Sequence, residues 1–402
     1  MKKKMLVRAM AICLATASVG ASAPSQAADG AVKIGFITDL SGLYADIDGQ
    51  GGLESIRMAI ADFGGKVNGK PIELVYADHQ NKPDVAASRA REWIDRDGVT
   101  AIIGGTNSGA ALSTNQVAGE KKIPYFNIGA GADTLTNEQC TPYTVHYAYD
   151  TMALAKGTGS AVTKAGGKTW YFLTADYAFG KALEKNTSDV VKANGGQVLG
   201  QVRHPLSASD FSSFLLQAQA SKAQVLGLAN ASTDTVNSIK AAREFGLTKT
   251  MKIAALLVFI TDIHSLGLET AQGLLSTDSW YWDQNDASRA WAKRYFAKMK
   301  KMPTSLQAAD YSATMTYLKA VQTVGSTDSD KVMAQLHTTT ISDFYAKGTI
   351  RPDGVMQHDM YLLEVKKPSE SKQPWDYYKV VATIPGDQAY GTKAESRCAL
   401  WK

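Results

Sequence analysis

The chain has 402 residues, of which 45% are hydrophobic and 20% charged, and its formal net charge is +5. A chain of this length is too long for one hydrophobic core and predicts two domains, and the lack of a long Pro/Ser linker predicts that they are closely joined. No clustered Lys/Arg run argues for nucleic acid or an anionic membrane as a partner.

The first residues have the pattern of a secretory signal peptide (1–27). Basic residues near the start precede an apolar run over 10–19, and small residues follow, so cleavage after Ala27 or Ala28 is expected. The run is too short for a permanent membrane span, and Cys13 lacks the small preceding residue of a lipoprotein cleavage site. Removing the peptide leaves 39 Lys and Arg against 38 Asp and Glu. We therefore expect a soluble, nearly neutral protein that is exported.

Short β-rich runs then alternate with helical patterns. Up to about residue 149, the expected strands are "VKIGFI", "PIELVYAD", "VTAIIGG" and "KIPYFNI", with helices over 52–63, 84–97 and 108–121. After residue 150 the expected strands are "KTWYFLT", "GQVLGQVR", "AQVLGLA" and "MKIAALLV", with helices over 152–163, 181–193, 211–220 and 233–245. Strands that alternate with helices form parallel sheets covered on both faces. The sequence therefore predicts an α/β fold with two parallel sheets.

The remaining residues are expected to return to these two sheets. "GLLSTDSWYW" is read as a strand, 287–299 and 306–324 as helices, and "HDMYLLEVKK" as one late strand. We assign 28–149 and about 279–348 to the first lobe. Residues 150–278 and about 349–402 form the second lobe, and short parallel crossings between the two make a hinge.

The segment "NIGAGADTL", residues 127–135, carries a Gly-x-Gly directly after a strand. A dinucleotide fingerprint would need a small residue where Thr134 stands and would normally follow the first strand of its unit, whereas this motif follows the fourth. The glycines instead favour backbone N–H groups that approach a carboxylate, with the Ser108 hydroxyl and the amino end of the helix near Ala110 beside them. A turn that only connects strand to helix is the alternative.

The sequence lacks the common patterns of catalytic and metal-binding residues. There is no G-x-S-x-G around Ser108 or Ser160, the six histidines are scattered, and no H-E-x-x-H or paired Cys at metal spacing occurs. We therefore expect no enzyme activity, no metal site and no cofactor.

Two cysteines remain after the signal peptide, Cys140 and Cys398. An oxidising compartment favours their pairing, which would tie the last residues to the first lobe and contribute about 5 kcal/mol in the chain-entropy model. Two unpaired thiols are the alternative.

Several motifs in order carry a family resemblance over nearly the whole mature chain: "VKIGFITDLSGLYAD", "GKPIELVYADHQNKPDVAASRAREWI", "AIIGGTNSGAALS", "KKIPYFNIGAGADTLT", "YFLTADYAFGKAL" and "AAREFGLTK". The chain resembles type I periplasmic solute-binding proteins of the branched-chain amino acid (Leu/Ile/Val) ABC transporter family. The resemblance implies two Rossmann-like lobes joined by three crossings, with a solute bound in the cleft between them. It also implies a monomer that delivers its solute to ABC permease subunits. A sensory binding protein that serves a receptor is an alternative.

The resemblance also implies which residues line the cleft. The first lobe would hold a solute carboxylate through Ser108, Gly129 and Gly131, beside Asn107. The other expected contacts are mostly aromatic, which suits a flat apolar solute: Tyr44, Tyr177, Phe179, Ala231, Leu256 and Trp280. Ala231 stands where amino acid binders often carry a tyrosine.

Leu256, near the end of the expected strand "MKIAALLV", restricts the class of solute that the cleft can bind. Amino acid binders of this family carry an acid just beyond this strand, because an α-ammonium taken out of water costs several kcal/mol unless a carboxylate replaces its hydration. Leu256 and its neighbours are apolar. We therefore expect a carboxylate with an aromatic or other apolar body. The alternative is that Asp262 enters the cleft and holds the ammonium of a branched-chain amino acid.

Overall fold

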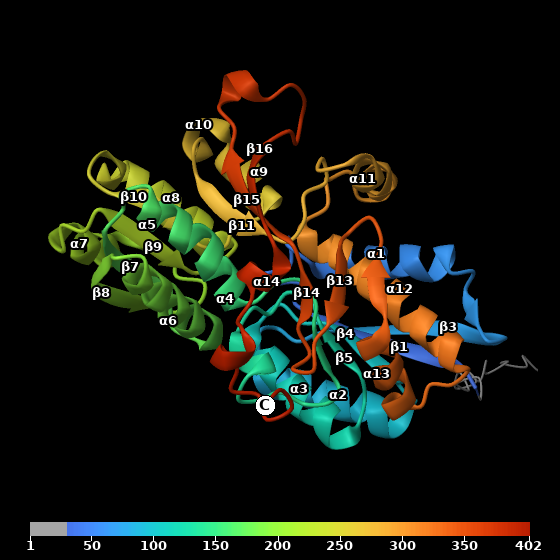
Figure 1. Ribbon diagram of the computed structural model, residues 1–402. Helices are drawn as coiled ribbons and strands as arrows, with labels where there is room; N and C mark the ends of the chain where they lie inside the picture. Colours follow the sequence, from blue (N-terminus) through green and yellow to red (C-terminus); the bar gives the residue numbers. More distant parts are fainter. Residues whose placement is uncertain (1–29) are drawn as a thin grey trace, which may run out of the picture.

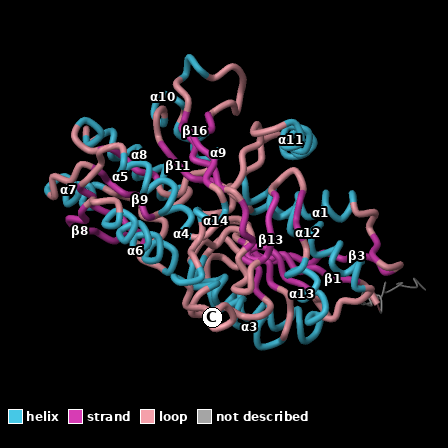
Figure 2. Tube along the Cα trace, viewed as in Figure 1, coloured by secondary structure: helices cyan, strands magenta, loops and turns pink. Residues whose placement is uncertain are grey.

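The computed structural model describes residues 30–402, so the predicted signal peptide and Cys13 lie outside the described part. Two α/β bodies lie side by side, and the late segments of the chain run between them (Figure 1). In both bodies helices surround a central group of strands (Figure 2). Over residues 30–402, no helix combines the length and the apolar character needed to cross a bilayer.

The first lobe is built on a six-stranded sheet in the order β2-β3-β1-β4-β5-β6. All its pairs are parallel except β2 with β3. Its strands are β1 (Val32–Thr38), β2 (Lys66–Val67), β3 (Lys70–Asp78), β4 (Ala101–Gly104), β5 (Tyr125–Asn127) and β6 (Thr144–His146).

Helices cover both faces of this sheet. On one face α1 packs on α12, and on the other α2 packs on α3. Ile103 of β4 joins the core cluster beneath α1 and α12, and its neighbour Ile102 joins the cluster beneath α2 and α3, as alternate residues of a strand must. These helices are α1 (Gly49–Asp62), α2 (Pro83–Glu92), α3 (Ser108–Lys121), α11 (Asp286–Met299), α12 (Ser305–Val324) and α13 (Ser329–Thr338).

The second lobe has a parallel four-stranded sheet in the order β10-β9-β7-β8. Its strands are β7 (Thr169–Ala175), β8 (Gln197–His204), β9 (Val225–Ala229) and β10 (Lys252–Ala255). Its helices are α4 (Thr151–Leu154), α5 (Ser160–Lys164), α6 (Ala178–Ala193), α7 (Ser212–Ala220), α8 (Thr233–Glu244), α9 (Ile260–Leu266) and α10 (Leu268–Ala271). The π-helical turn η3 (Ala155–Gly159) joins α4 to α5, so both lie on the one expected helix at 152–163.

The last third of the chain contains more strands than the one expected after residue 330. An antiparallel sheet β11-β15-β16 extends the second lobe, and an antiparallel sheet β12-β13-β14 lies beside the first. Their bounds are β11 (Leu275–Asp278), β12 (Thr340–Ser342), β13 (Lys347–Ile350), β14 (Met356–His358), β15 (Met360–Val365) and β16 (Tyr378–Ile384), followed by α14 (Gly386–Ala389). The lobe boundary expected at 348/349 falls inside β13.

Three crossings connect the lobes: one after β6, one after β11 and one between β14 and β15. Buried polar contacts hold the crossings together. The carbonyl of Ala148, on the first crossing, lies 3.0 Å from Nε2 of His358, on the third. The Tyr390 hydroxyl lies 3.0 Å from the same nitrogen. The expected fold, two parallel-sheet lobes on a three-crossing hinge, is confirmed.

The C-terminal residues return to the first lobe. Cys140 and Cys398 form a disulfide, with 5.7 Å between their Cα atoms, so the predicted pairing is confirmed. Beside it the backbone N–H of Arg397 donates to the Asn137 side chain at 3.0 Å. The disulfide links positions 258 residues apart in sequence.

Candidate functional site

One contact between the two lobes is made by a loop of the first lobe, residues 39–44, between β1 and α1. The hydroxyl of Tyr44 lies 2.6 Å from that of Tyr177, which precedes α6 in the second lobe. The hydroxyl of Ser232, which precedes α8, donates to the carbonyl of Leu43 at 2.9 Å. The structure therefore has the cleft closed at this loop.

Asp39 holds this loop in shape. One of its carboxylate oxygens accepts the N–H of Gly42 at 2.6 Å, and the other accepts the N–H of Tyr44 at 2.9 Å and the Asn81 amide at 2.5 Å. Hydrogen bonds from backbone amides to a carboxylate are among the stronger ones in proteins. Asp39 thereby fixes the position of Tyr44 in the cleft.

The amino end of α3 forms the first-lobe side of the expected carboxylate cradle. The Asn107 side chain caps this helix by accepting the N–H groups of Gly109 and Ala110, so its oxygen acts within the helix. The Ser108 oxygen accepts the N–H of Ala132 at 3.2 Å. The Ser108 hydroxyl proton remains available as a donor.

The two glycines of the cradle differ. The N–H of Gly129 donates to the Gly105 carbonyl at 2.8 Å, so this amide is not free for a solute, contrary to expectation. A Cβ at this position would lie 2.7 Å from Leu306, so close packing accounts for Gly129. A Cβ at Gly131 would instead lie 2.9 Å from the ring of Phe179 and 3.0 Å from that of Tyr149. Gly131 therefore lies directly beneath aromatic rings.

These rings form a group that crosses the cleft. Phe179 and Tyr177 lie with their ring centroids 6.1 Å apart, and Tyr149 and Phe259 with theirs 6.4 Å apart. Tyr149, on the first crossing, also donates its hydroxyl to the Gly129 carbonyl at 2.9 Å. Tyr149 and Phe259 were not expected from the sequence, because the motif resemblance does not extend to either position.

The second-lobe segment that follows β10 is apolar, as expected. Residues 254–260 are all buried hydrophobics, and Leu256 is fully buried. The carboxylate of Asp262 accepts the N–H of Phe259 at 2.9 Å and thus caps α9. Burial raises the pKa of Asp262 to about 7. Asp262 therefore has a structural role at the start of its own helix.

Asp234 of α8 is an acid that sequence reasoning missed. One of its carboxylate oxygens accepts the N–H of Ser207 at 3.1 Å, and the other is buried without a partner among the described residues. Burial raises the pKa of Asp234 to about 6. Asp234 lies near the cleft, because it is in the first turn of α8, two residues after Ser232, whose hydroxyl reaches Leu43 of the first lobe.

Ala231 and Trp280 complete the expected set. Ala231 is buried at the end of β9, directly before Ser232. The indole N–H of Trp280 lies 3.0 Å from the Ser288 hydroxyl, and its ring packs edge-on against Trp291 of α11. These contacts support a packing role for Trp280 at the second crossing, and its part in solute binding stays a prediction.

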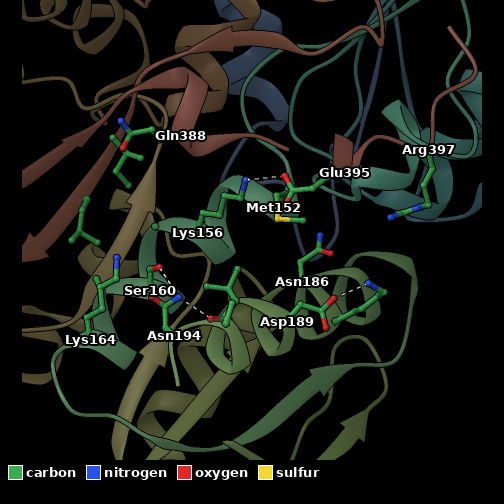
Figure 3. Close-up of a pocket in the computed structure, with 17 residues that line it drawn as sticks. Met152, Lys156, Ser160, Lys164, Asn186, Asp189, Asn194, Gln388, Glu395 and Arg397 are labelled. Atoms are coloured by element: carbon green, nitrogen blue, oxygen red, sulfur yellow. Dashed lines mark hydrogen bonds and ion pairs between the residues drawn. The ribbon is translucent and has the colours of Figure 1, made fainter. Parts of the chain in front are cut away.

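A second hollow, of about 750 Å³, lies between α6 and the C-terminal segment (Figure 3). Two of its basic residues face acids: Lys156 pairs with Glu395 at 3.2 Å, and Lys185 pairs with Asp189 at 2.9 Å. None of the residues expected in the solute site lines it. The hollow is therefore distinct from the candidate site.

Comparisons with known proteins agree with this architecture. A model of the periplasmic binding protein family matches residues 31–372. The crystal structure of a periplasmic binding protein from Burkholderia mallei is 80% identical, with a TM-score of 0.92 over 93% of this chain and 100% of that one. A branched chain amino acid ABC transporter periplasmic ligand-binding protein from Burkholderia xenovorans LB400 is 45% identical, with a TM-score of 0.82 over 92% of this chain and 100% of that one.

A more distant structure shows the same fold. A solute-binding protein of an ABC transporter from Rhodopseudomonas palustris BisB5, in complex with 3,4-dihydroxybenzoic acid, is 22% identical, with a TM-score of 0.80 over 89% of this chain and 98% of that one. Because the family model matches most of the chain, the protein belongs to the periplasmic binding protein family, as a type I solute-binding protein of the class that serves ABC importers.

Proposed function

We propose that the protein binds a small carboxylate with an aromatic or other apolar body in the interlobe cleft and delivers it, as a monomer, to the permease of an ABC importer. The protein performs no chemistry on the solute. The first lobe receives the carboxylate, and closure of the second lobe produces the form that the permease recognises.

The carboxylate end of the solute has a defined place in this proposal. It lies against the N–H of Gly131 and the hydroxyl of Ser108, at the amino end of α3, where the helix dipole favours negative charge. The Ser108 oxygen accepts the N–H of Ala132, which leaves its hydroxyl proton available for donation to a solute carboxylate. Asn107 contributes through the helix cap that orients this end.

The residues that contact the apolar end of the solute determine which class of solute is bound. The single observation on which it rests is the unbroken run of buried hydrophobic residues over 254–260. The aromatic group of Phe179, Tyr149 and Phe259 supplies flat walls, which suit a benzoate or phenylpropenoate. An α-ammonium placed against Leu256 would lose its hydration without a replacement.

A branched-chain amino acid is the second candidate, and one observation favours it. Asp234, two residues after the interlobe contact of Ser232, keeps a buried carboxylate oxygen that has no partner within residues 30–402. An ammonium that reached this oxygen would supply the missing donor. In this alternative Asp234, and not Asp262, balances the solute's positive charge. A sensory protein that presents its solute to a receptor would use the same site.

A thermal-shift screen separates these solute classes. The mature protein is heated with benzoate, 4-hydroxybenzoate and cinnamate in one set, and with leucine, isoleucine and valine in another. A ligand at 100 times its Kd stabilises the folded state by about 2.7 kcal/mol, which a rise in Tm reports. We expect stabilisation by aromatic acids. Stabilisation by leucine, isoleucine or valine alone would contradict the proposal.

A substitution at Leu256 refines the test. Leu256→Glu places a charge in the apolar segment and should abolish the response to aromatic acids, whereas the volume-conserving Leu256→Met should keep it. If Leu256→Glu keeps full affinity for aromatic acids in calorimetry, the apolar segment does not contact the solute. Asp234→Asn should leave aromatic acids bound and should weaken only a solute with an ammonium.

A further inference from the structure

Ser232 has a backbone conformation that serine rarely adopts. Its φ is 54° and its ψ is −134°, a region that favours glycine because a Cβ is crowded there. Such conformations persist only where the surrounding structure imposes them, and they cluster at sites of ligand binding and switching. Ser232 lies directly before α8, on the side of the second lobe that faces the loop at 39–44.

The Ser232 side chain also gives up its usual local role. A serine at the residue before a helix normally accepts an N–H from the first turn. At Ser232 no such hydrogen bond is made. Its hydroxyl instead crosses the cleft and donates to the Leu43 carbonyl at 2.9 Å, and the residue is buried. Ser232 therefore lacks both a relaxed backbone and a helix-capping hydrogen bond, and its side chain makes an interlobe contact instead.

We propose that Ser232 is a closure latch, a positioning residue whose strained backbone and uncapped helix are tolerated because its hydroxyl holds the first lobe in the closed state. Leu43 is adjacent to Tyr44, whose hydroxyl meets Tyr177. The second lobe thus grips the same loop at two neighbouring points. Asp39 keeps that loop rigid, so the two hydrogen bonds form or break together.

The latch gives a ligand-independent contribution to closure. The Ser232 hydroxyl can bond the Leu43 carbonyl only when the lobes are together, and on opening it is free to rotate toward water or toward the first turn of α8. A contact made in one state alone shifts the equilibrium toward that state. Its loss should lower the ratio of closed to open molecules by ~3- to 10-fold, the size of one hydrogen bond.

Two substitutions at this position separate strain from latching. Ser232→Ala removes the hydroxyl and keeps the unfavourable backbone, whereas Ser232→Gly removes both. Both variants should open the protein to the same extent. The Tm of Ser232→Gly should be higher than the Tm of Ser232→Ala, because glycine adopts this φ without a Cβ clash. Thr233→Ala, a change at the exposed next residue, is the matched control and should leave closure unchanged.

Closure is measured between exposed sites on opposite lobes. In the mature protein without Cys13, nitroxide labels on Lys240→Cys of α8 and Lys293→Cys of α11 report the interlobe distance by pulsed electron resonance, while Cys140 and Cys398 stay in their disulfide. Distances are recorded without solute and with benzoate and leucine as separate probes. The measurement without solute does not depend on the proposed function, which fails separately if neither probe changes the distance or the Tm.

Three results would overturn the latch. An unchanged distance distribution in Ser232→Ala would show that the hydrogen bond does not hold the lobes. Equal Tm values for Ser232→Ala and Ser232→Gly would show that the backbone is not strained. A wild-type protein without a closed population, both alone and with either probe, would show that the closed contact does not form in solution.

Discussion

Two carboxyl groups meet in the interior of the first lobe, and replacing one of them gives a prediction whose size can be worked out. Asp48, before α1, and Asp310, on α12, are fully buried. Both converge on Gly52, where a Cβ would lie 2.5 Å from an Asp310 oxygen. Asp48 accepts the hydroxyl proton of Thr38 at 2.5 Å. Burial raises the pKa of Asp310 well above its usual value, and the charge of Asp48 raises it further, so Asp310 keeps a proton.

This proton makes stability depend on pH. In the unfolded chain Asp310 ionises near pH 4, whereas in the folded protein it stays protonated, so folding takes up a proton above that pH. A raised carboxyl pKa favours the folded state fully below about pH 4, and that contribution is lost as the pH rises toward the folded pKa. The loss is at most about 1.4 kcal/mol per pH unit, over the pH range between the unfolded and the folded pKa.

The substitution Asp310→Asn isolates this term. Asparagine is close to aspartic acid in shape and binds no proton, so the free energy of unfolding of the variant, relative to wild type, should rise with pH above about pH 4, by at most about 1.4 kcal/mol per pH unit. Urea denaturation followed by tryptophan fluorescence measures the difference at each pH. Buried acids away from Asp310 contribute equally to both proteins and cancel, whereas Asp48 titrates beside the substituted residue, so the measured difference belongs to the pair of carboxyl groups.

Asp62→Asn is the control for this experiment. Asp62 pairs with Arg294 near the surface, and the arginine helps to lower the pKa of Asp62 against the opposing effect of partial burial. Asp62 is therefore ionised in both states between pH 5 and pH 7, and its replacement should give an offset that does not change with pH. If the Asp310→Asn difference is equally flat, Asp310 does not hold a proton in the folded protein.

Two further predictions concern the solute cradle and the disulfide. Ser108→Ala should weaken binding of the best carboxylate in the screen by about 1.5 to 3 kcal/mol, the range for a hydrogen bond to a charged group, with little change in Tm; unchanged affinity in calorimetry would remove Ser108 from the site. The double variant Cys140→Ser/Cys398→Ser should lose about 5 kcal/mol of unfolding free energy, because the disulfide closes a long loop of the unfolded chain. Equal denaturation midpoints for the wild type with and without reductant would count against that contribution.

Much of the fold could be predicted from the sequence because its parallel strands are continuous apolar runs. β1, β4, β7 and β9 are buried on both faces and show as such in the sequence. The late strands β12 and β14 were missed because each has three residues and includes polar ones. Strands this short owe their pairing to neighbouring segments and not to their own pattern.

The proximity of Ser108 and Gly131 could be predicted from the order of the strands, whereas hydrogen bonds and ring contacts between loops could not. Ser108 and Gly131 follow consecutive strands, and the carboxyl ends of such strands converge at one edge of a sheet. The occupied amide of Gly129 could not be predicted, because its acceptor, Gly105, belongs to another loop. Tyr149 and Phe259 were missed for a similar reason, since closure and the first crossing bring them together.

In the proposed function the two lobes divide the recognition of a solute between them. The proposed cradle would use a backbone amide, a helix end and the hydroxyl of Ser108, which any carboxylate can satisfy, so changes there should affect all acids alike. The second lobe contributes Phe179, Phe259 and the apolar residues around Leu256. These residues would fit some apolar groups of a solute better than others, according to shape and polarity. Since a ligand closes the protein only through the contacts that exist in the closed state, the same second-lobe residues that choose the solute also determine how far it drives closure. Substitutions in the second lobe are therefore expected to change both the choice of solute and the extent of closure. Substitutions in the first lobe are expected to change the affinity for all carboxylates without changing the choice among them.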